Sequence, residues 1–323
     1  MILTPEQLRA AFKKLGVGGD DFQLAAEVGA GFVARTRAGG IAWVVPLSEA
    51  AETSGRRAGG FVLAPMSEVA FEFEGRRWSA PAAVWESTDS ALLDTFLVLI
   101  ADAARSLEAR PSWKQIVEYV DQWQSLLARR PTLTPEQQLG LWAELSIIER
   151  SESPDVLVAG WRGPEGDPVD FFVDEVGLEI KASRRRHAHH VSQSQANRPV
   201  GQRESFTLSL WVGSDPTAGT SVVDLVEKIV ERVVEKPEFL RKLSKVGFSI
   251  ADQESYRSTR FVELEPFVIF RTDDIPRVHD VDPAISELRY LVTLNAEDGV
   301  GGPEAARVRA HFELEEPKQG ELK

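Results

Sequence analysis

The sequence predicts a mixed α/β protein in which a β-rich N-terminal domain precedes a domain containing both helices and strands. Three observations predict this class. Residues 15–85 contain short apolar runs separated by glycine, which is typical of strands joined by tight turns. From Ser87 onward the apolar residues recur at helical spacing. After Thr134, segments with helical spacing are followed by segments with strand-like alternation.

These changes of pattern divide the chain into segments. The N-terminal sequence MILTPEQLRAAFKKLG indicates a capped amphipathic helix and not a signal peptide. Two stretches of helical spacing lie between the β-rich part and Thr134. We expect a β-rich domain at residues 1–85, a helical connector at 86–133, the main α/β domain at 134–313 and a polar tail at 314–323.

The main domain is expected to begin with a helix. Thr134 is the N-cap, Pro135 suits the first turn, and Gln137 completes a capping box. Beyond it we expect strands at 169–173 and 177–183, a strand at 205–213, a helix at 220–237 ended by Pro237, and short helices and strands over 237–295.

Composition excludes several classes of protein. The chain has 323 residues, of which 43% are hydrophobic and 27% charged, as in a globular protein. It has no cysteine, so disulfides, thiolate catalysis and cysteine-ligated metal centres are excluded. No apolar run is long enough to cross a bilayer. A cytoplasmic location is the expectation that fits.

Charge is unevenly distributed along the chain. The net charge of −13 argues against a protein that passively coats nucleic acid, but an enzyme with a local basic groove remains possible. From Lys181 to Arg203 there are six Lys or Arg residues and no Asp or Glu. His187, His189 and His190 lie in the same stretch. It is either a solvated basic loop or a surface that faces phosphate.

Two predicted strands carry charges on one face. Glu179 and Lys181 alternate with the apolar residues Leu178 and Ile180, so the two charged side chains point the same way. A hairpin would bring Asp170 beside Glu179, and two adjacent carboxylates repel each other unless a cation lies between them. Their oxygens suit Mg²⁺ or Mn²⁺. Lys181 would then lie next to metal-bound water or a phosphate.

Glu144 is out of place on the first helix of this domain. It lies within the apolar stripe formed by Leu141, Leu145 and Ile148. A glutamate on a core-facing side needs a metal, a lysine or a backbone partner. The alternative is a glutamate at the edge of the stripe that reaches solvent.

Together these residues resemble the PD-(D/E)xK nuclease superfamily, in which an Asp precedes Glu-x-Lys and an earlier helix supplies a Glu. The resemblance extends over GLWAEL, GWRGPEGDPVDFF, LEIKAS, HHVSQSQ, SLWV and TSVVDLVEKI, in that order. It is similar to a bacterial PD-(D/E)xK family of unassigned function, encoded beside DNA methyltransferases and helicase-like ATPases in restriction or phage-defence clusters. It covers roughly residues 134–295 well, and the N-terminal third only in its β-rich character.

The resemblance implies a role for each matched position. It makes Asp170 and Glu179 metal ligands, Lys181 the catalytic lysine, and Glu144 a ligand that acts directly or through water. It places Gln195 where a polar residue supports the site or touches substrate. The sequence departs from the family at Val169, where we expect a histidine.

The implied activity is Mg²⁺- or Mn²⁺-dependent hydrolysis of DNA within a restriction-type defence system, with one or two ions. Arg184, Arg185, Arg186, His189 and His190 are expected to contact DNA. Trp161, in the loop before Asp170, is expected to anchor that loop more than to contact DNA. The rival interpretation is a DNA-binding or assembly subunit that does not cleave, and RNA remains open as the substrate.

Overall fold

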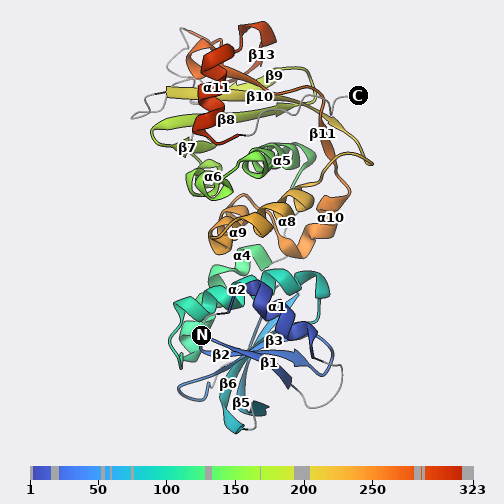
Figure 1. The fold of residues 1–323 in the computed structure, drawn as a ribbon, viewed down its shortest axis with the longest axis vertical. Helices are drawn as coiled ribbons and strands as arrows, with labels where there is room; N and C mark the ends of the chain where they lie inside the picture. Colours follow the sequence, from blue (N-terminus) through green and yellow to red (C-terminus); the bar gives the residue numbers. More distant parts are fainter. Residues whose placement is uncertain are drawn as a thin grey trace. The chain divides into compact units, whose positions relative to one another are not determined.

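The protein is described by a computed structural model with two compact units (Figure 1). One unit comprises residues 1–130 and 249–251, and the other comprises residues 131–248 and 252–323. The structure describes residues 3–15, 22–51, 55–58, 60–73, 76–127, 133–167, 169–192, 204–279, 285 and 288–314. Each unit pairs a β-sheet with helices, so the predicted mixed α/β class with a β-rich N-terminal part is confirmed.

The N-terminal unit is built on an antiparallel sheet with strand order β1-β2-β3-β6-β5-β4. Its strands are β1 (Phe22–Val28), β2 (Gly31–Thr36), β3 (Ile41–Pro46), β4 (Arg56–Ala58), β5 (Phe61–Phe73) and β6 (Arg76–Ser87). Gly39 lies in the turn between β2 and β3 at φ +87°, a backbone conformation that side chains with a Cβ rarely adopt. The glycine-separated runs of the sequence therefore correspond to these strands and turns.

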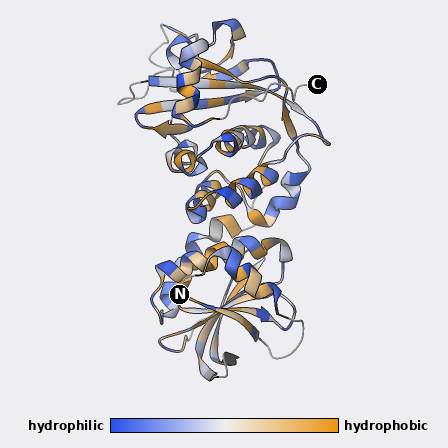
Figure 2. Cartoon of the chain, in the orientation of Figure 1, coloured by the Kyte–Doolittle hydropathy of each residue, from blue (hydrophilic) through white to orange (hydrophobic). Residues whose placement is uncertain are grey.

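Helices complete the N-terminal unit. They are α1 (Pro5–Lys13), α2 (Leu93–Ser106), α3 (Trp113–Gln122) and α4 (Gln124–Leu127), with a 3-10 turn at Ser90–Leu92. An aromatic cluster joins sheet to helices: Trp85 of β6 lies 4.7 Å from Phe96 and 6.4 Å from Tyr119, measured between ring centroids. Figure 2 shows the hydrophobic residues of these strands and helices. The helices expected as a connector thus share one core with the sheet.

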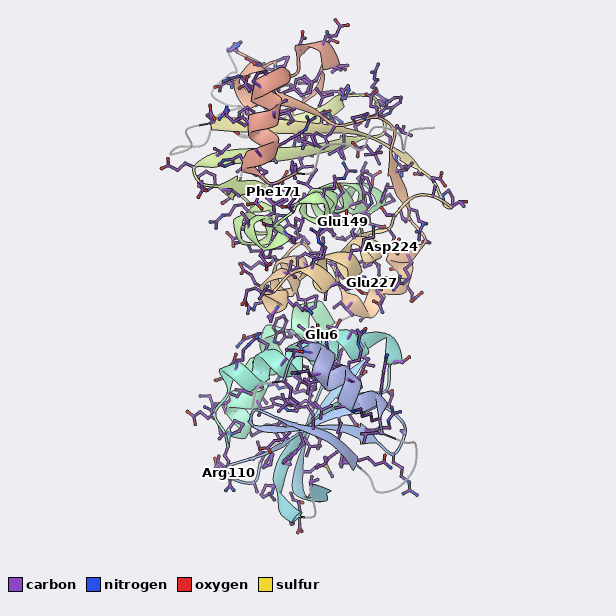
Figure 3. All side chains as sticks on the ribbon, in the orientation of Figure 1. Glu6, Arg110, Glu149, Phe171, Asp224 and Glu227 are labelled. Carbon is purple, nitrogen blue, oxygen red and sulfur yellow. The ribbon has the colours of Figure 1, made fainter. Side chains whose placement is uncertain are left out.

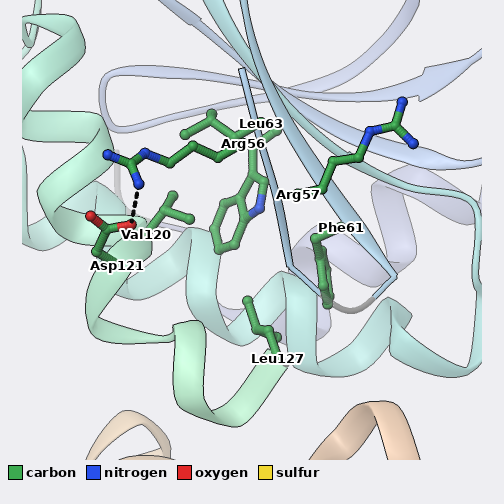
Figure 4. Close-up of a pocket in the computed structure, with 8 residues that line it drawn as sticks. Arg56, Arg57, Phe61, Leu63, Val120, Asp121 and Leu127 are labelled. Atoms are coloured by element: carbon green, nitrogen blue, oxygen red, sulfur yellow. Dashed lines mark ion pairs between the residues drawn. The ribbon is translucent and has the colours of Figure 1, made fainter. Parts of the chain in front are cut away.

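A small pocket lies at the edge of this core (Figure 4). Its volume is about 170 Å³. Arg56 of β4 and Asp121 of α3 form an ion pair there, with a nitrogen–oxygen distance of 3.7 Å. Its lining comprises Arg56, Arg57, Phe61, Leu63, Trp85, Val120, Asp121 and Leu127. The floor therefore consists of buried core side chains and the two exposed members of the ion pair lie at the surface.

The sheet of the C-terminal unit has the order β11-β10-β8-β7, and β12 also pairs with β10. The central pair β8–β10 is parallel, whereas β7, β11 and β12 run antiparallel to their partners. The strands are β7 (Phe171–Val173), β8 (Val176–Ser183), β10 (Glu204–Ser214), β11 (Phe261–Glu263) and β12 (Val268–Arg271). A separate ribbon pairs β9 (Ala188–Ser192) with β13 (Arg289–Thr293).

The helices of this unit form layers beside the sheet. Helix α5 (Pro135–Arg150) packs on β8 and on α8 (Val222–Arg232), while α6 (Pro154–Gly160) packs on β7 and α9 (Lys236–Lys245) (Figure 1). The capping box of α5 forms as predicted, with Thr134 accepting from the Gln137 amide. The remaining elements are η2 (Gly163–Glu165), η3 (Ile250–Asp252), α10 (Gln253–Arg257), η4 (Thr272–Asp274), η5 (Ala296–Asp298) and α11 (Gly302–His311).

Two expectations about this unit change. The helix predicted to end at Pro237 ends at Arg232, and Pro237 instead lies in the first turn of α9. Proline suits that position because the first amides of a helix have no intrahelical partner. The polar tail from residue 315 lies outside the described residues, whereas Leu314 is buried and forms an isolated β-bridge with Ser151. Across the described chain, no helix is long and apolar enough to span a membrane.

Candidate active site

A tight hairpin brings two predicted site residues together. Asp174 and Glu175 occupy the turn between β7 and β8 at φ +42° and +68°, the left-handed conformation that two-residue hairpin turns favour. Phe171, labelled in Figure 3, pairs with Leu178 in this hairpin. Continuing the same register by one residue places Asp170 opposite Glu179. The predicted pairing of strands therefore forms.

Asp170 is held at the point where β7 begins. Its Oδ2 accepts a hydrogen bond of 2.6 Å from the Ile180 amide, which has no β7 backbone partner at that position. The Asp170 carbonyl oxygen accepts from the amides of Arg162 and Gly163, at 2.6 and 3.2 Å. Side chain and backbone of Asp170 are thus both fixed, one by β8 and the other by the loop after α6.

Glu179 and Lys181 share one face of β8, as the alternation predicted. The Lys181 Nζ lies 2.6 Å from Glu179 Oε1. Both side chains are largely enclosed, at 6% exposed for Glu179 and 16% for Lys181. Leu178 and Ile180 are buried. Charged side chains are therefore presented from a strand whose intervening residues belong to the core.

Glu144 reaches the same region from α5. Its Oε2 accepts a hydrogen bond of 2.6 Å from the indole nitrogen of Trp161. A Cβ placed on Gly163 would lie 2.8 Å from Glu144 Oε2 and 3.3 Å from Asp170 Oδ1, so both carboxylates border this glycine. Trp161 is fully buried, which agrees with the expected role of loop anchor. The glutamate in the apolar stripe therefore faces the cluster, where it is half-buried.

Burial and mutual repulsion favour protonation of the three carboxylates. Burial raises the pKa of Glu144 from 4.5 to about 7, against the hydrogen bond from Trp161, and repulsion by Glu179 adds to the rise. The pKa of Asp170 is raised well above its ordinary range by burial and then by the charges of Glu179 and Glu144. Burial also raises the pKa of Glu179, although Lys181 opposes it. A cation would relieve this repulsion.

The chemistry of the three carboxylates fits a hard divalent cation such as Mg²⁺ or Mn²⁺. Each carboxylate has a protein donor: Trp161 donates to Glu144, the Ile180 amide to Asp170, and Lys181 to Glu179. Among the described residues, no three Asp, Glu or His side chains converge closely enough to hold a metal ion as they stand. An ion held by all three carboxylates would therefore require some of these side chains to move.

Comparison with known families decides the class. The profile of a family described as "Putative PD-(D/E)XK family member, (DUF4420)" matches residues 33–295. The chain belongs to this PD-(D/E)XK family. Membership points to nuclease activity. The match begins within β2, so it extends well beyond the residues 134–295 that carry the clear motif resemblance. Neither the curated proteins nor the solved structures contain a match.

The arginines expected to contact DNA follow the PD-(D/E)XK motif at the end of β8. Arg184 and Arg185 are exposed and form no ion pair with other described residues. Arg186 is exposed but pairs with Glu265, at 2.8 Å between Nε and Oε1. His190 is also exposed. Residues 193–203, which include Gln195, lie outside the described residues.

Two of the three histidines in this PD-(D/E)XK chain are not at the surface, which corrects the expectation that they face phosphate or solvent. His187 and His189 are 2% and 3% exposed. His187 Nδ1 and His189 Nε2 each lie 2.7 Å from Ser209 Oγ, and His187 Nε2 lies 2.9 Å from Glu265 Oε1. Burial lowers the pKa of His189 to about 3, so it is neutral and of no use as a cation for DNA.

Sequence reasoning missed the residues that hold this PD-(D/E)XK cluster in place. Trp161 was identified as an anchor but not as the donor to Glu144, and Gly163 was not recognised as the residue that both carboxylates border. Lys242 of α9 was missed entirely. One signal was available, because Lys242 lies three residues after Phe239 and therefore on the apolar face of its helix. Val169, at the position expected to hold histidine, is buried.

Proposed function

We propose that this chain is a divalent-metal-dependent nuclease that hydrolyses phosphodiester bonds of DNA. The observation that carries the proposal is the cluster of buried Glu179 with half-buried Glu144, Asp170 and Lys181, in the order that the resemblance to PD-(D/E)XK proteins implies. An ordinary structural ion pair needs one carboxylate for one lysine. Three carboxylates beside one lysine, one of them buried and two half-buried, are costly to stability unless a further cation joins them.

Each member of the cluster has a separate role in the proposal. Asp170 and Glu179 hold a Mg²⁺ or Mn²⁺ ion, and Glu144 holds it directly or through water. When bound, the ion supplies Lewis-acid polarisation of a phosphate oxygen and an acidified water. Lys181 donates from the same strand face as Glu179 and stabilises negative charge that develops on the reacting phosphate. The Ile180 amide restrains Asp170, which limits its movement during the reaction.

Local charge supports a nucleic acid as the substrate. The chain is acidic overall, so a phosphate backbone needs a positive surface next to the carboxylates. Arg184 and Arg185 provide exposed positive charge within a few residues of Lys181, and His190 lies nearby in sequence. Arg186 contributes less, because Glu265 neutralises it. We assign Gln195 a supporting role at this site by resemblance to the family.

The resemblance also supports a biological setting, a restriction-type phage-defence system with methyltransferase and helicase-like partners. A second candidate function is a non-catalytic DNA-binding or assembly subunit of such a system. It is favoured by the protein donors that already engage all three carboxylates, since these donors offset part of the cost of the cluster in the absence of an ion. The two candidates differ in whether metal ions confer cleavage.

The test is a cleavage time course on matched duplex DNA, single-stranded DNA and RNA, with Mg²⁺, Mn²⁺ or EDTA. It is run with the chain alone and with helicase and methyltransferase partners. Wild type should cut DNA only with metal, and Glu179→Gln should abolish cutting because it removes a ligand charge while keeping the side-chain shape. Cutting of RNA alone would reassign the substrate. Absence of metal-dependent cutting under all conditions, with DNA binding retained, would favour the non-catalytic subunit.

A further inference from the structure

Lys242 is a buried lysine outside the carboxylate cluster. Its side chain is 8% exposed, and its ammonium donates to three backbone carbonyls: Val158 at 2.6 Å, Ala159 at 3.0 Å and Trp161 at 3.0 Å. Glu238, one turn earlier on α9, lies 3.6 Å from the same nitrogen but is itself more exposed. Most of the stabilisation of this buried charge therefore comes from the backbone that leads from α6 into the site.

Capping of α6 explains the three hydrogen bonds of Lys242, but not the second contact that α9 makes with Trp161. The last carbonyls of a helix lack intrahelical donors, and a lysine often supplies them. Val158 and Ala159 lie within α6 and fit that explanation. Trp161 is the C-cap residue of α6, so its carbonyl belongs to the same set. Phe239, on the same face of α9 as Lys242, also contacts Trp161, with 6.2 Å between ring centroids. Helix α9 thus contacts both the backbone and the ring of Trp161.

Trp161 connects α9 to the carboxylates. Its indole nitrogen donates to Glu144 Oε2 at 2.6 Å, and its backbone forms a β-bridge with Phe171 at the start of β7. The backbone amides of the next two residues, Arg162 and Gly163, donate to the carbonyl oxygen of Asp170. Movement of Trp161 would therefore change the position of Glu144 relative to Asp170, although these residues lie on different elements.

We propose that Lys242 is a positioning residue for the candidate active site: by holding the Trp161 carbonyl it sets the Trp161–Glu144 hydrogen bond and so the place of Glu144 beside Asp170. The consequence for metal binding rests on the proposed function, whereas the consequence for the hydrogen bond does not. Lys242 itself is too deeply enclosed to contact a nucleic acid, so its effect passes through Trp161.

The experiment compares Lys242→Met, Trp161→Phe and the double variant in the full chain. Trp161→Phe keeps an aromatic ring against Phe239 but removes the indole donor, together with part of the packed volume. Lys245→Met is the matched control, because Lys245 is on the same helix and 56% exposed. Two quantities are measured, the Mn²⁺ affinity and the NMR resonance of the Trp161 indole N–H, which is assigned by its absence in Trp161→Phe. A melting curve monitors folding, and Lys242→Gln replaces Lys242→Met if the latter does not fold.

We expect Lys242→Met and Trp161→Phe each to weaken Mn²⁺ binding about 10- to 100-fold, as is typical when an outer partner of a metal ligand is lost. The double variant should bind Mn²⁺ no more weakly than the weaker-binding single variant, because both changes interrupt the same chain of contacts from Lys242 through Trp161 to Glu144. The indole resonance of Lys242→Met should shift toward its position in Glu144→Ala and exchange faster with water. Lys245→Met should match wild type in both measurements.

An unchanged indole resonance in Lys242→Met would overturn the proposal and leave Lys242 as a helix cap only. Lowered melting temperature with unchanged Mn²⁺ affinity would overturn it as well, because a purely structural role predicts that result. A wild type that binds no Mn²⁺ would instead defeat the proposed function. In that case the indole resonance still decides whether Lys242 sets the Trp161–Glu144 hydrogen bond.

Discussion

Both units pack helices against a sheet, but they bury different kinds of side chain. In the N-terminal unit the core is aromatic and aliphatic, with Trp43, Trp85 and Phe96 fully enclosed, and its buried polar residues among those described are the uncharged Thr36, Ser87 and Ser249. The C-terminal unit encloses Glu179, His187, His189 and Lys242 together with a row of hydroxyl side chains on β10.

We interpret this difference as a division between residues that stabilise the fold and residues that take part in chemistry. Burying a charged group costs free energy, and each such group in the C-terminal unit is held by a specific partner. The described part of the N-terminal unit forms its core without such groups. Under the proposed function, the charged groups enclosed in the C-terminal unit belong to the active site or to its support. An exposed ion pair such as that of Glu227 on α8 with Arg257 contributes little to stability; Glu227 is labelled in Figure 3.

The largest effect should come from the aromatic core. Trp85→Ala should destabilise the N-terminal unit by about 3–5 kcal/mol, because it leaves a cavity beside Phe96 and Tyr119. Hydrogen exchange read by mass spectrometry should show lost protection in the N-terminal unit, with Mn²⁺ affinity of the folded protein unchanged. Equal loss of protection in both units, together with loss of Mn²⁺ affinity, would show that the two units do not divide stability and chemistry in this way.

Lys181→Ala tests the charged residues of the C-terminal unit. Removal of one charge directed at the reacting phosphate should slow cleavage by roughly 10²–10³-fold. The protein should still fold, because Leu178 and Ile180 keep the apolar face of β8 intact, but its melting temperature should fall, because buried Glu179 loses its ion-pair partner. Lys228→Ala, an exposed lysine of α8, is the control in the same cleavage assay. Cleavage by Lys181→Ala at the wild-type rate would remove the lysine from the mechanism.

The pH dependence of stability should reveal the carboxylate cluster. Because the pKa of Glu144 is raised from 4.5 to about 7, the folded state holds a proton that the unfolded state releases between these values. Stability of the metal-free protein should therefore fall as pH rises from about 4.5 to 7, by an amount on the order of 3 kcal/mol from this group.

Urea unfolding at several pH values measures this fall, and Glu144→Gln should flatten it because the amide does not titrate. Mn²⁺ should restore stability most strongly at the high end of the range, where the carboxylates are charged. Stability that rises over this window in wild type and Glu144→Gln alike would contradict the proposed environment of Glu144.

The smallest effect concerns the surface arginines. Replacing Arg184 and Arg185 together with Ala should weaken DNA binding modestly and lower the slope of log affinity against log salt by about 2. Arg110→Ala, an exposed arginine of the N-terminal unit labelled in Figure 3, is the matched control. An unchanged salt slope in the double variant, or an equal fall in Arg110→Ala, would place the DNA path elsewhere.

Local rules were sufficient to predict much of the fold and the cluster. The capping box of α5 depends on residues three apart, and the face shared by Glu179 and Lys181 depends on strand alternation, so both could be derived from adjacent residues. The turn at Asp174 and Glu175 then fixed the register that brings Asp170 to Glu179.

Contacts between distant segments could not be derived in this way. His187 adopts φ +48° before β9, which turns the chain so that His187 and His189 both contact Ser209 on β10, 20 or more residues away. The basic run in the sequence therefore predicted surface exposure for two histidines that are buried. Lys242 contacts a loop more than 80 residues earlier, and no local pattern identifies that partner.

The most direct measurement of the central claim is a crystal structure with Mn²⁺ soaked in, read by anomalous scattering. The account predicts an anomalous peak within coordination distance of Asp170 and Glu179, with Lys181 released from Glu179 and Glu144 at or near the ion. A saturating soak that leaves no peak there, with Asp170 still bonded to the Ile180 amide and Glu179 to Lys181, would contradict it.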